Sequence, residues 1–402
     1  MTRFFVKFLD EHCALPGRHC QAEGMTAVNA EPLSVLRTRT SEKWVAYPPH
    51  VLPLFVAEMD YPLAEPVATA MIDRIRASDT GYVAGTGDLP AALARFAEQT
   101  WGWAIDEDGV RTTTDVSVAI VESLRVAIRP GDRVIITPPV YPPFFDLVPE
   151  AGGVVAEVPL LTEGGYALDL AGIEAAFAAG ATAMLLCNPH NPLGLVHPRA
   201  ALEALAELAA RYGATIVSDE IHGPLVYETA AFTPFLTVSD AAREHTITVT
   251  SASKAFNLAG VKCAIFVAAS ARTKAMLDRL PEEVGFRTSL LGLHASVAAF
   301  TDGGPWLAGV LESLDANRRL LSGLLAEHLP GVRYSPPAAS YLAWLDFREV
   351  GWGDDPGIRA LDAGVALNSG PTFGAEGRGF ARLNFACSPE VLTEAIERLA
   401  RS

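Results

Sequence analysis

Long apolar runs are missing from this chain of 402 residues, although half of its residues are hydrophobic. No uninterrupted apolar stretch approaches the roughly 18 residues that a membrane span needs. The first seven residues lead into Asp10 and Glu11 rather than into the apolar core of a secretory signal. We therefore expect a cytoplasmic protein with large buried cores and no membrane partner.

Cysteine is also scarce, and the five cysteines are odd in number and widely scattered. This distribution disfavours a disulfide framework. Cys187 and Cys263 lie in apolar segments, where a thiol usually packs as a small hydrophobic group. The His-Cys pairs at 12–13 and 19–20 match no zinc-ligand spacing, so we expect no metal site.

Basic residues are outnumbered by acidic ones. The chain has 31 Lys and Arg against 47 Asp and Glu, which gives a formal net charge of -16. Such a charge disfavours nucleic acid or an anionic membrane surface as a partner. An anionic small molecule would therefore need individually placed arginines.

Short apolar runs alternate with helical patterns along much of the chain. Their continuous apolarity predicts strands that are buried on both faces, as in a parallel sheet. The sequence therefore predicts an α/β fold whose large domain has a mostly parallel sheet with helices on both faces. The predicted strands are 133–137, 154–158, 183–187, 215–218, 246–250 and 264–267.

The pattern changes after about residue 285. Two long helical stretches, near 287–301 and 305–328, precede a predicted strand at 341–345. These elements indicate a second, smaller α+β domain. We predict an N-terminal tail at 1–24, a segment joining the small domain at 25–55, the large domain at 56–286 and the small domain at 287–402.

Polar residues follow several of the predicted strand ends. Asn191 follows the strand at 183–187, Asp219 follows the next strand, and Lys254 lies just beyond the strand at 246–250. Ligands bind at the carboxyl ends of parallel strands. A lysine beside small hydroxyl residues, with a carboxylate nearby, is what a Schiff-base site for pyridoxal phosphate requires. Taken singly, these residues are also explained as a surface lysine, a helix cap and a turn.

Longer motifs give a more specific indication. They are Ser41-Glu42-Lys43-Trp44 and the segments 52–62, 218–222, 340–346 and 374–384. On these motifs the chain, from about residue 26 to 402, resembles the fold-type I pyridoxal-phosphate enzymes. The narrower resemblance is to the MalY/PatB-type carbon-sulfur β-lyases, the cystathionine β-lyases. It implies a seven-stranded sheet in the large domain and pyridoxal 5'-phosphate as cofactor.

The resemblance also implies roles for the matching residues. Lys254 would bind the cofactor covalently and remove the Cα proton of the substrate. Asp219 would pair with the ring nitrogen, which keeps the ring protonated and able to accept electrons. Asn191 would donate to the phenolic oxygen and Tyr141 would stack on the ring. His222 matches a cofactor-binding position, where a structural role stays equally open.

The phosphate of the cofactor would be bound by hydroxyl and basic side chains together with backbone amides at the start of a helix. Asp115 departs from the pattern, because relatives commonly carry glycine there and an anion beside a phosphate is unfavourable unless its side chain turns away. The implied phosphate-binding residues are Ser251, Ser253, Lys262, Val116 and Ser117.

Arg382 would bind the α-carboxylate of a small-molecule amino-acid substrate, with Asn191 and Tyr341 beside it. Tyr341 is equally explained as a core residue, and nearby Arg378 as an exposed one. Tyr82 matches a tyrosine that reaches the site of a neighbouring subunit, which implies a catalytic role for it and a homodimer with shared active sites. The other explanation for Tyr82 is a buried core aromatic.

The implied reaction is α,β-elimination on L-cystathionine or a related cysteine S-conjugate, which gives a thiol, pyruvate and ammonia. A class I/II aminotransferase is the alternative, because transamination begins with removal of the same Cα proton. A regulatory or interaction protein that retains the fold is an alternative from another class, since a fold does not determine function.

Overall fold

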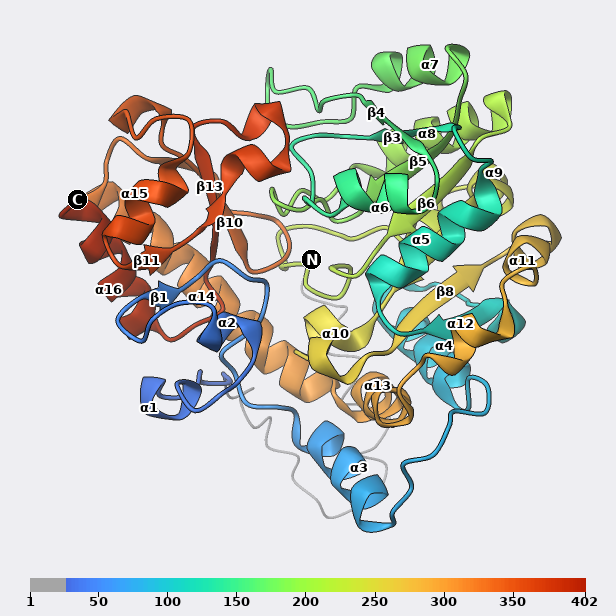
Figure 1. The fold of residues 1–402 in the computed structure, drawn as a ribbon, viewed down its shortest axis with the longest axis horizontal. Coiled ribbons are helices and arrows are strands. Elements are labelled where there is room, and N and C mark those ends of the chain that lie inside the picture. Colours follow the sequence, from blue (N-terminus) through green and yellow to red (C-terminus); the bar gives the residue numbers. More distant parts are fainter. Residues whose placement is uncertain (1–26) are drawn as a thin grey trace, which may run out of the picture.

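The computed structural model describes residues 27–402, so the predicted tail at 1–24 and its His-Cys pairs lie outside the described residues. Within that range a seven-stranded sheet forms the centre of one lobe, as expected (Figure 1). Its strands in spatial order are β2 (Val110–Thr113), β8 (Ala264–Ala268), β7 (Thr246–Thr250), β6 (Thr215–Asp219), β5 (Ala181–Cys187), β3 (Arg133–Ile136) and β4 (Val154–Glu157).

The sheet is mostly parallel, which confirms the predicted fold class. Strands β7, β6, β5, β3 and β4 pair in parallel, whereas β8 runs antiparallel to both β7 and β2. All six predicted strands are present to within a few residues. The sequence analysis missed β2, whose Val-Arg-Thr-Thr sequence lacks a continuous apolar run.

Helices cover both faces of this sheet (Figure 1). One apolar cluster joins it to α5 (Val116–Ala127), α6 (Phe144–Glu150), α11 (Ala271–Leu277) and α12 (Glu282–Phe286). A second cluster joins it to α7 (Leu170–Ala178), α8 (Arg199–Tyr212) and α9 (Asp240–His245). Capping residues determine where these helices begin and end. The Asp169 side chain accepts from the amide of Gly172 at the start of α7, and Gly213 ends α8 at a φ of 64°.

The second lobe contains an antiparallel sheet in the order β12 (Asn368–Ser369), β13 (Phe380–Asn384), β10 (Leu342–Asp346) and β9 (Arg333–Tyr334). Strand β1 (Leu52–Pro53) pairs in parallel with β11 (Val365–Ala366), so an N-terminal strand lies against the C-terminal lobe. The predicted boundaries between tail, joining segment and two domains remain predictions.

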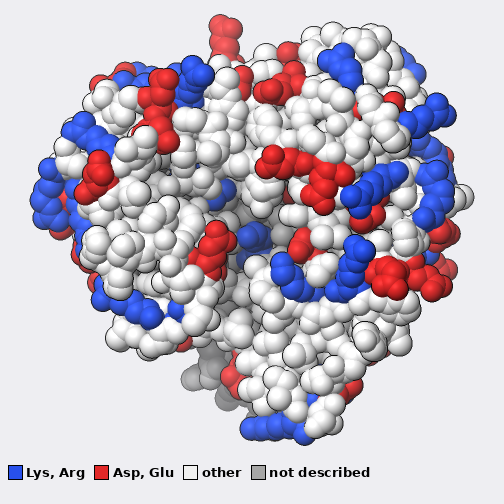
Figure 2. All heavy atoms as spheres, viewed as in Figure 1, with Lys and Arg blue, Asp and Glu red and all other residues white. Residues whose placement is uncertain are grey.

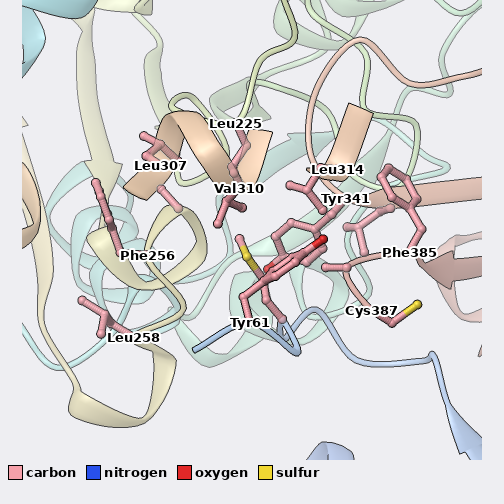
Figure 3. Packing of buried hydrophobic residues seen from close by; sticks show 14 of the residues in the cluster. Tyr61, Leu225, Phe256, Leu258, Leu307, Val310, Leu314, Tyr341, Phe385 and Cys387 are labelled. Atoms are coloured by element: carbon pink, nitrogen blue, oxygen red, sulfur yellow. The ribbon is translucent and has the colours of Figure 1, made fainter. Parts of the chain in front are cut away.

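The remaining helices are α1 (Leu33–Leu36), α2 (Glu42–Val45), α3 (Glu65–Arg76), α4 (Leu89–Trp101), α10 (Ala252–Ala255), α13 (Leu290–Asp302), α14 (Gly304–His328), α15 (Pro356–Asp362) and α16 (Pro389–Ala400). Helices α13 and α14 correspond to the two predicted helical stretches. The largest apolar cluster contains residues of both lobes, and Figure 3 shows Tyr61 and Tyr341 within it, close to Val310 and Leu314 of α14. The two lobes therefore share one apolar core.

Within residues 27–402, Cys187, Cys263 and Cys387 are buried free thiols. No helix in that range is long and apolar enough to cross a membrane. The same residues contain no group of three or more His, Cys, Asp or Glu side chains arranged to hold a metal ion.

Candidate active site

The predicted polar residues do converge at one edge of the large sheet. Asp219 lies beside Cys187 in the register of β5 and β6, and beside Val249 in the register of β6 and β7. The amide of Asn188 donates to the carbonyl of Asp219 at 2.9 Å, so the loop that carries Asn191 starts at the same place. Figure 2 shows a hollow between the two lobes with basic groups at its floor.

Lys254 lies on the short helix α10, directly after β7. Its Nζ donates to the carbonyl oxygen of Ala57 at 2.8 Å. Burial, aided by the positive charge of Arg382, lowers the pKa of Lys254 to about 8, although Glu58 and Asp219 act in the opposite direction. At pH 7 roughly a tenth of such an amine is neutral, far more than for an ordinary lysine, so it can act as a nucleophile and as a base.

Asp219 is a buried carboxylate without a salt-bridge partner among the described residues. Its Oδ1 accepts from the amide of Ile221 at 3.2 Å. Burial raises the pKa of Asp219 to about 7, while that amide and Lys254 partly oppose the shift. A protonated ring nitrogen placed beside this carboxylate would favour its ionised form, because an adjacent cation lowers the pKa of an acid.

Arg382 on β13 is a buried cation bound only by neutral groups. Its Nη1 donates to Oδ1 of Asn191 at 3.0 Å, and its Nη2 donates to the carbonyl of Phe55 at 2.9 Å. Its Nε is buried and has no partner among the described residues. Burial lowers the pKa of Arg382 to about 10. A buried guanidinium without a carboxylate is costly, so an anionic ligand would stabilise it.

Three further predicted residues surround these groups. Tyr341 is fully buried and its hydroxyl donates to Ala57 O at 3.1 Å, so it is both a core residue and a neighbour of Lys254. The rings of His222 and Tyr341 pack edge to face, with their centroids 6.2 Å apart. Burial lowers the pKa of His222 to about 3. The imidazole is therefore neutral, and its Nδ1 has no partner among the described residues. Tyr141 is half-buried, and Asp219 adds to burial in raising its pKa.

The expected phosphate site has its elements in place but a different charge balance. Val116 and Ser117 open α5, and Asp115 is the N-cap whose Oδ1 accepts from the amide of Val118 at 3.0 Å. Its Oδ2 lies 3.0 Å from Nζ of Lys262 in a partly exposed ion pair. The Asp115 carboxylate therefore already neutralises the basic group expected to meet a phosphate.

The two serines at the start of α10 differ. The Ser251 hydroxyl donates to Cys263 O at 2.6 Å and accepts from the amide of Ser253, so it caps α10 and holds the neighbouring chain. Ser253 is half-buried at the edge of the site. The predicted phosphate contacts of these serines remain predictions.

Tyr82 does not belong to the core, because 94% of its side chain is exposed. The alternative explanation as a buried aromatic is therefore wrong. Arg378 is also exposed, as expected for a residue that does not line the pocket.

The sequence analysis missed the groups that hold Lys254 in place. Ala57 contributes its carbonyl oxygen, which no side-chain pattern reveals. Asn384 binds the backbone on both sides of Ala57, with 2.7 Å bonds to the carbonyls of Val56 and Glu58. Both residues lie within motifs that carried the resemblance, which was the only signal of them in the sequence.

The fold and the site together define the class of protein. Residues 49–399 match the family described as aminotransferase class I and II, and the chain belongs to this family. The protein is thus a pyridoxal-phosphate-dependent enzyme, as the sequence indicated.

More particular similarities are to carbon-sulfur lyases. The chain is 38% identical to cystathionine beta-lyase of Corynebacterium glutamicum, covering 92% of this chain and 98% of the relative. It is 33% identical to cystathionine beta-lyase PatB of Bacillus subtilis, covering 87% and 91%. The crystal structure of cystalysin from Treponema denticola, which contains pyridoxal 5'-phosphate, matches with a TM-score of 0.85 at 26% identity, covering 91% of this chain and 96% of that one.

Proposed function

We propose that this protein is a carbon-sulfur β-lyase that catalyses α,β-elimination on L-cystathionine or a related cysteine S-conjugate. The observation that carries the proposal is the pairing of Lys254, an amine with a pKa of about 8, with the buried, carboxylate-free Arg382 in one site. The similarity to cystathionine β-lyases over most of the chain supports elimination rather than transamination. A cytoplasmic location is part of the proposal.

The residues present fit the cofactor. Lys254 supplies the amine for its aldehyde, Asp219 the anion for its ring nitrogen, and Asn191 a side-chain amide that contacts Arg382. Bound there, pyridoxal phosphate withdraws electrons from the substrate Cα. Tyr141 would lie on the ring, and His222 would lie near the Asp219 side. The phosphate would meet Val116, Ser117, Ser253 and Lys262, with Ser251 holding α10 in place.

Arg382 would orient the substrate. Its guanidinium can bind the α-carboxylate in two places, because Nε is unpartnered and the contacts of Nη1 and Nη2 are to neutral oxygens. Fixing the carboxylate also fixes the direction of the Cα-H bond. The Tyr341 hydroxyl, which donates to the same Ala57 oxygen as Lys254, would line the pocket near Lys254.

Lys254 would then move the proton. Its neutral amine takes the Cα proton, and the resulting ammonium can donate to the carbonyl of Ala57, the acceptor seen in the structure. The electron pair left at Cα forms the Cα-Cβ double bond as the Cβ-S bond breaks. The sulfur leaves as a thiol after taking up a proton, and water converts the remaining fragment to pyruvate and ammonia.

Incubation of the purified protein with L-cystathionine tests the proposal. We expect equal amounts of pyruvate, ammonia and free thiol, and we expect Lys254→Ala to abolish all three. Lys274→Ala, which changes a lysine outside the site, serves as the matched control and should retain activity. Conversion of the bound cofactor to its amine form with release of a keto acid that retains sulfur would instead establish an aminotransferase.

The proposal includes a homodimer in which Tyr82 contributes to the partner's site. The strong exposure of Tyr82 supports this arrangement, because a large aromatic side chain exposed in the single chain is typical of a surface that a partner covers. Mixing Lys254→Ala subunits with Tyr82→Phe subunits tests it. Shared sites predict that hybrids regain activity that neither variant has alone, and additive residual activities would contradict sharing.

A further inference from the structure

The segment Phe55–Tyr61, here called the strap, contacts Lys254 and Arg382 and has no regular secondary structure. Buried backbone carbonyls need hydrogen-bond donors, and outside helices and sheets these must come from elsewhere. In the strap every carbonyl has one. The donors are Arg382 to Phe55 O, Asn384 to Val56 O, Lys254 and Tyr341 to Ala57 O, Asn384 and Lys43 to Glu58 O, Asn257 and Arg39 to Met59 O, the Glu31 amide to Asp60 O, and Arg39 to Tyr61 O.

Asn384 has a special place among these donors. It is fully buried at the end of β13, and its Nδ2 donates at 2.7 Å to Val56 O and at 2.7 Å to Glu58 O. Its Oδ1 accepts from the amide of Ala386 at 2.8 Å, which fixes the plane of the side-chain amide. The carbonyl of Ala57 therefore lies between two carbonyls that one rigid group holds.

We propose that Asn384 is a positioning residue for Lys254, because it clamps the strap on both sides of Ala57 and so holds the Ala57 carbonyl against the Lys254 amine. The side-chain hydrogen bonds of Asn384 go to Val56, Glu58 and Ala386, and none of them goes to Lys254 or Arg382. The inference rests on the proposed function, in which Lys254 is the reacting amine. In this role the strap supplies the hydrogen-bond acceptor, the Ala57 carbonyl, for the protonated form of Lys254.

Releasing the Ala57 carbonyl should change the pKa of Lys254. The carbonyl is a hydrogen-bond acceptor, and the ammonium form of Lys254 donates to it more strongly than the neutral amine does. Loss of a well-placed charge-assisted hydrogen bond therefore favours the amine, by about one pKa unit. The charged groups that face Lys254 are Arg382 from β13, Asp219 from β6 and Glu58 from the strap, and all three remain when Asn384 is replaced.

The chain offers a closely matched control in Asn317 on α14. It is also a buried asparagine whose Nδ2 donates to two backbone carbonyls, Phe385 O at 2.9 Å and Cys387 O at 2.7 Å. Those carbonyls lie just beyond β13 and do not belong to the strap. Asn317→Ala therefore removes the same number of donated bonds, two, without releasing Ala57.

The experiment measures the pKa of Lys254 in the full-length chain freed of cofactor. The rate of trace acetylation at Lys254 is followed against pH by mass spectrometry of its peptide. We expect the pKa to fall by about one unit in Asn384→Ala and to change little in Asn317→Ala. Thermal melting identifies folded material, and Asn384→Ser, which retains one donor, replaces the alanine variant if that does not fold.

Equal Lys254 pKa values in the wild type and both variants would overturn the inference, and so would equal shifts in the two variants. A separate measurement distinguishes failure of the proposed function. Hydride reduction of the cofactor-loaded wild type, followed by peptide mapping, should place a pyridoxyl group on Lys254. Absence of that adduct refutes the proposed role of Lys254, whereas an adduct without the pKa shift refutes only the role of Asn384.

Discussion

Replacing Lys43 by methionine should destabilise the protein strongly, because it leaves a buried carboxylate without its cation. Lys43 Nζ lies 2.7 Å from Asp60 Oδ1, and the two side chains are 0% and 1% exposed. Lys43 also donates to Glu58 O at 3.1 Å, and Asp60 Oδ2 has no hydrogen-bond partner among the described residues. Removing one member of a buried ion pair costs about 3–5 kcal/mol of unfolding free energy.

The cost should depend on pH in a defined direction. Burial raises the pKa of Asp60 above its usual value, and Lys43 limits that rise. Without Lys43 the pKa of Asp60 in the folded state rises further, so the folded state binds a proton that the unfolded state has lost. Stability then falls as the pH rises above about 4, with a slope of at most ~1.4 kcal/mol per pH unit, until the folded-state pKa is passed. The deficit of Lys43→Met is therefore smallest in acid.

Urea unfolding of the cofactor-free chain, followed by circular dichroism across the pH range in which it stays folded, measures this deficit. Lys274→Met is the matched control, because Lys274 pairs with Asp106 at the surface, where the side chains are 25% and 56% exposed. That variant should lose less than about 1 kcal/mol. Replacing Asp60 by leucine together with Lys43→Met should recover most of the loss. A deficit below about 1 kcal/mol for Lys43→Met, or one independent of pH, would refute the reasoning.

Arg382→Lys should lower kcat/KM on L-cystathionine about 100-fold, because the lost bidentate contact with the carboxylate is worth about 3 kcal/mol. Arg378 is exposed, so Arg378→Lys should change kcat/KM little in the same steady-state assay. Asp115→Asn keeps a hydrogen-bond acceptor at the helix cap but removes the anion beside Lys262. Pyridoxal phosphate should therefore bind several-fold more tightly in an equilibrium titration. Weaker binding would contradict this expectation. Asp219 has its pKa raised to about 7 by burial, so its ionisation costs cofactor-free stability as the pH rises from about 4 to about 7. Asp219→Asn should therefore gain stability relative to the wild type over that interval in urea unfolding, and a constant difference would argue against the shift.

The sequence carried most of the fold because the strands of a covered parallel sheet are continuously apolar. All six predicted strands from 133 to 267 are present. The Asp169 side chain caps the start of α7, and Gly213 ends α8 in a left-handed conformation. The direction of β8 was not predictable in this way. The apolar pattern of a buried strand is the same whether the strand pairs in parallel or antiparallel. The direction of pairing depends on the path that the chain takes before and after the strand.

The same division holds for the site. The sequence alone determined which groups were available, namely Lys254, Asp219 and Arg382, because their chemistry and their places after strands are local properties. Only the tertiary structure decided that Asp115 pairs with Lys262, that Tyr82 is exposed, and that Lys254 and Tyr341 share the carbonyl of Ala57, at sequence separations of 197 and 284 residues. Every residue carries the same backbone carbonyl, so its partner is set by packing rather than by its side chain.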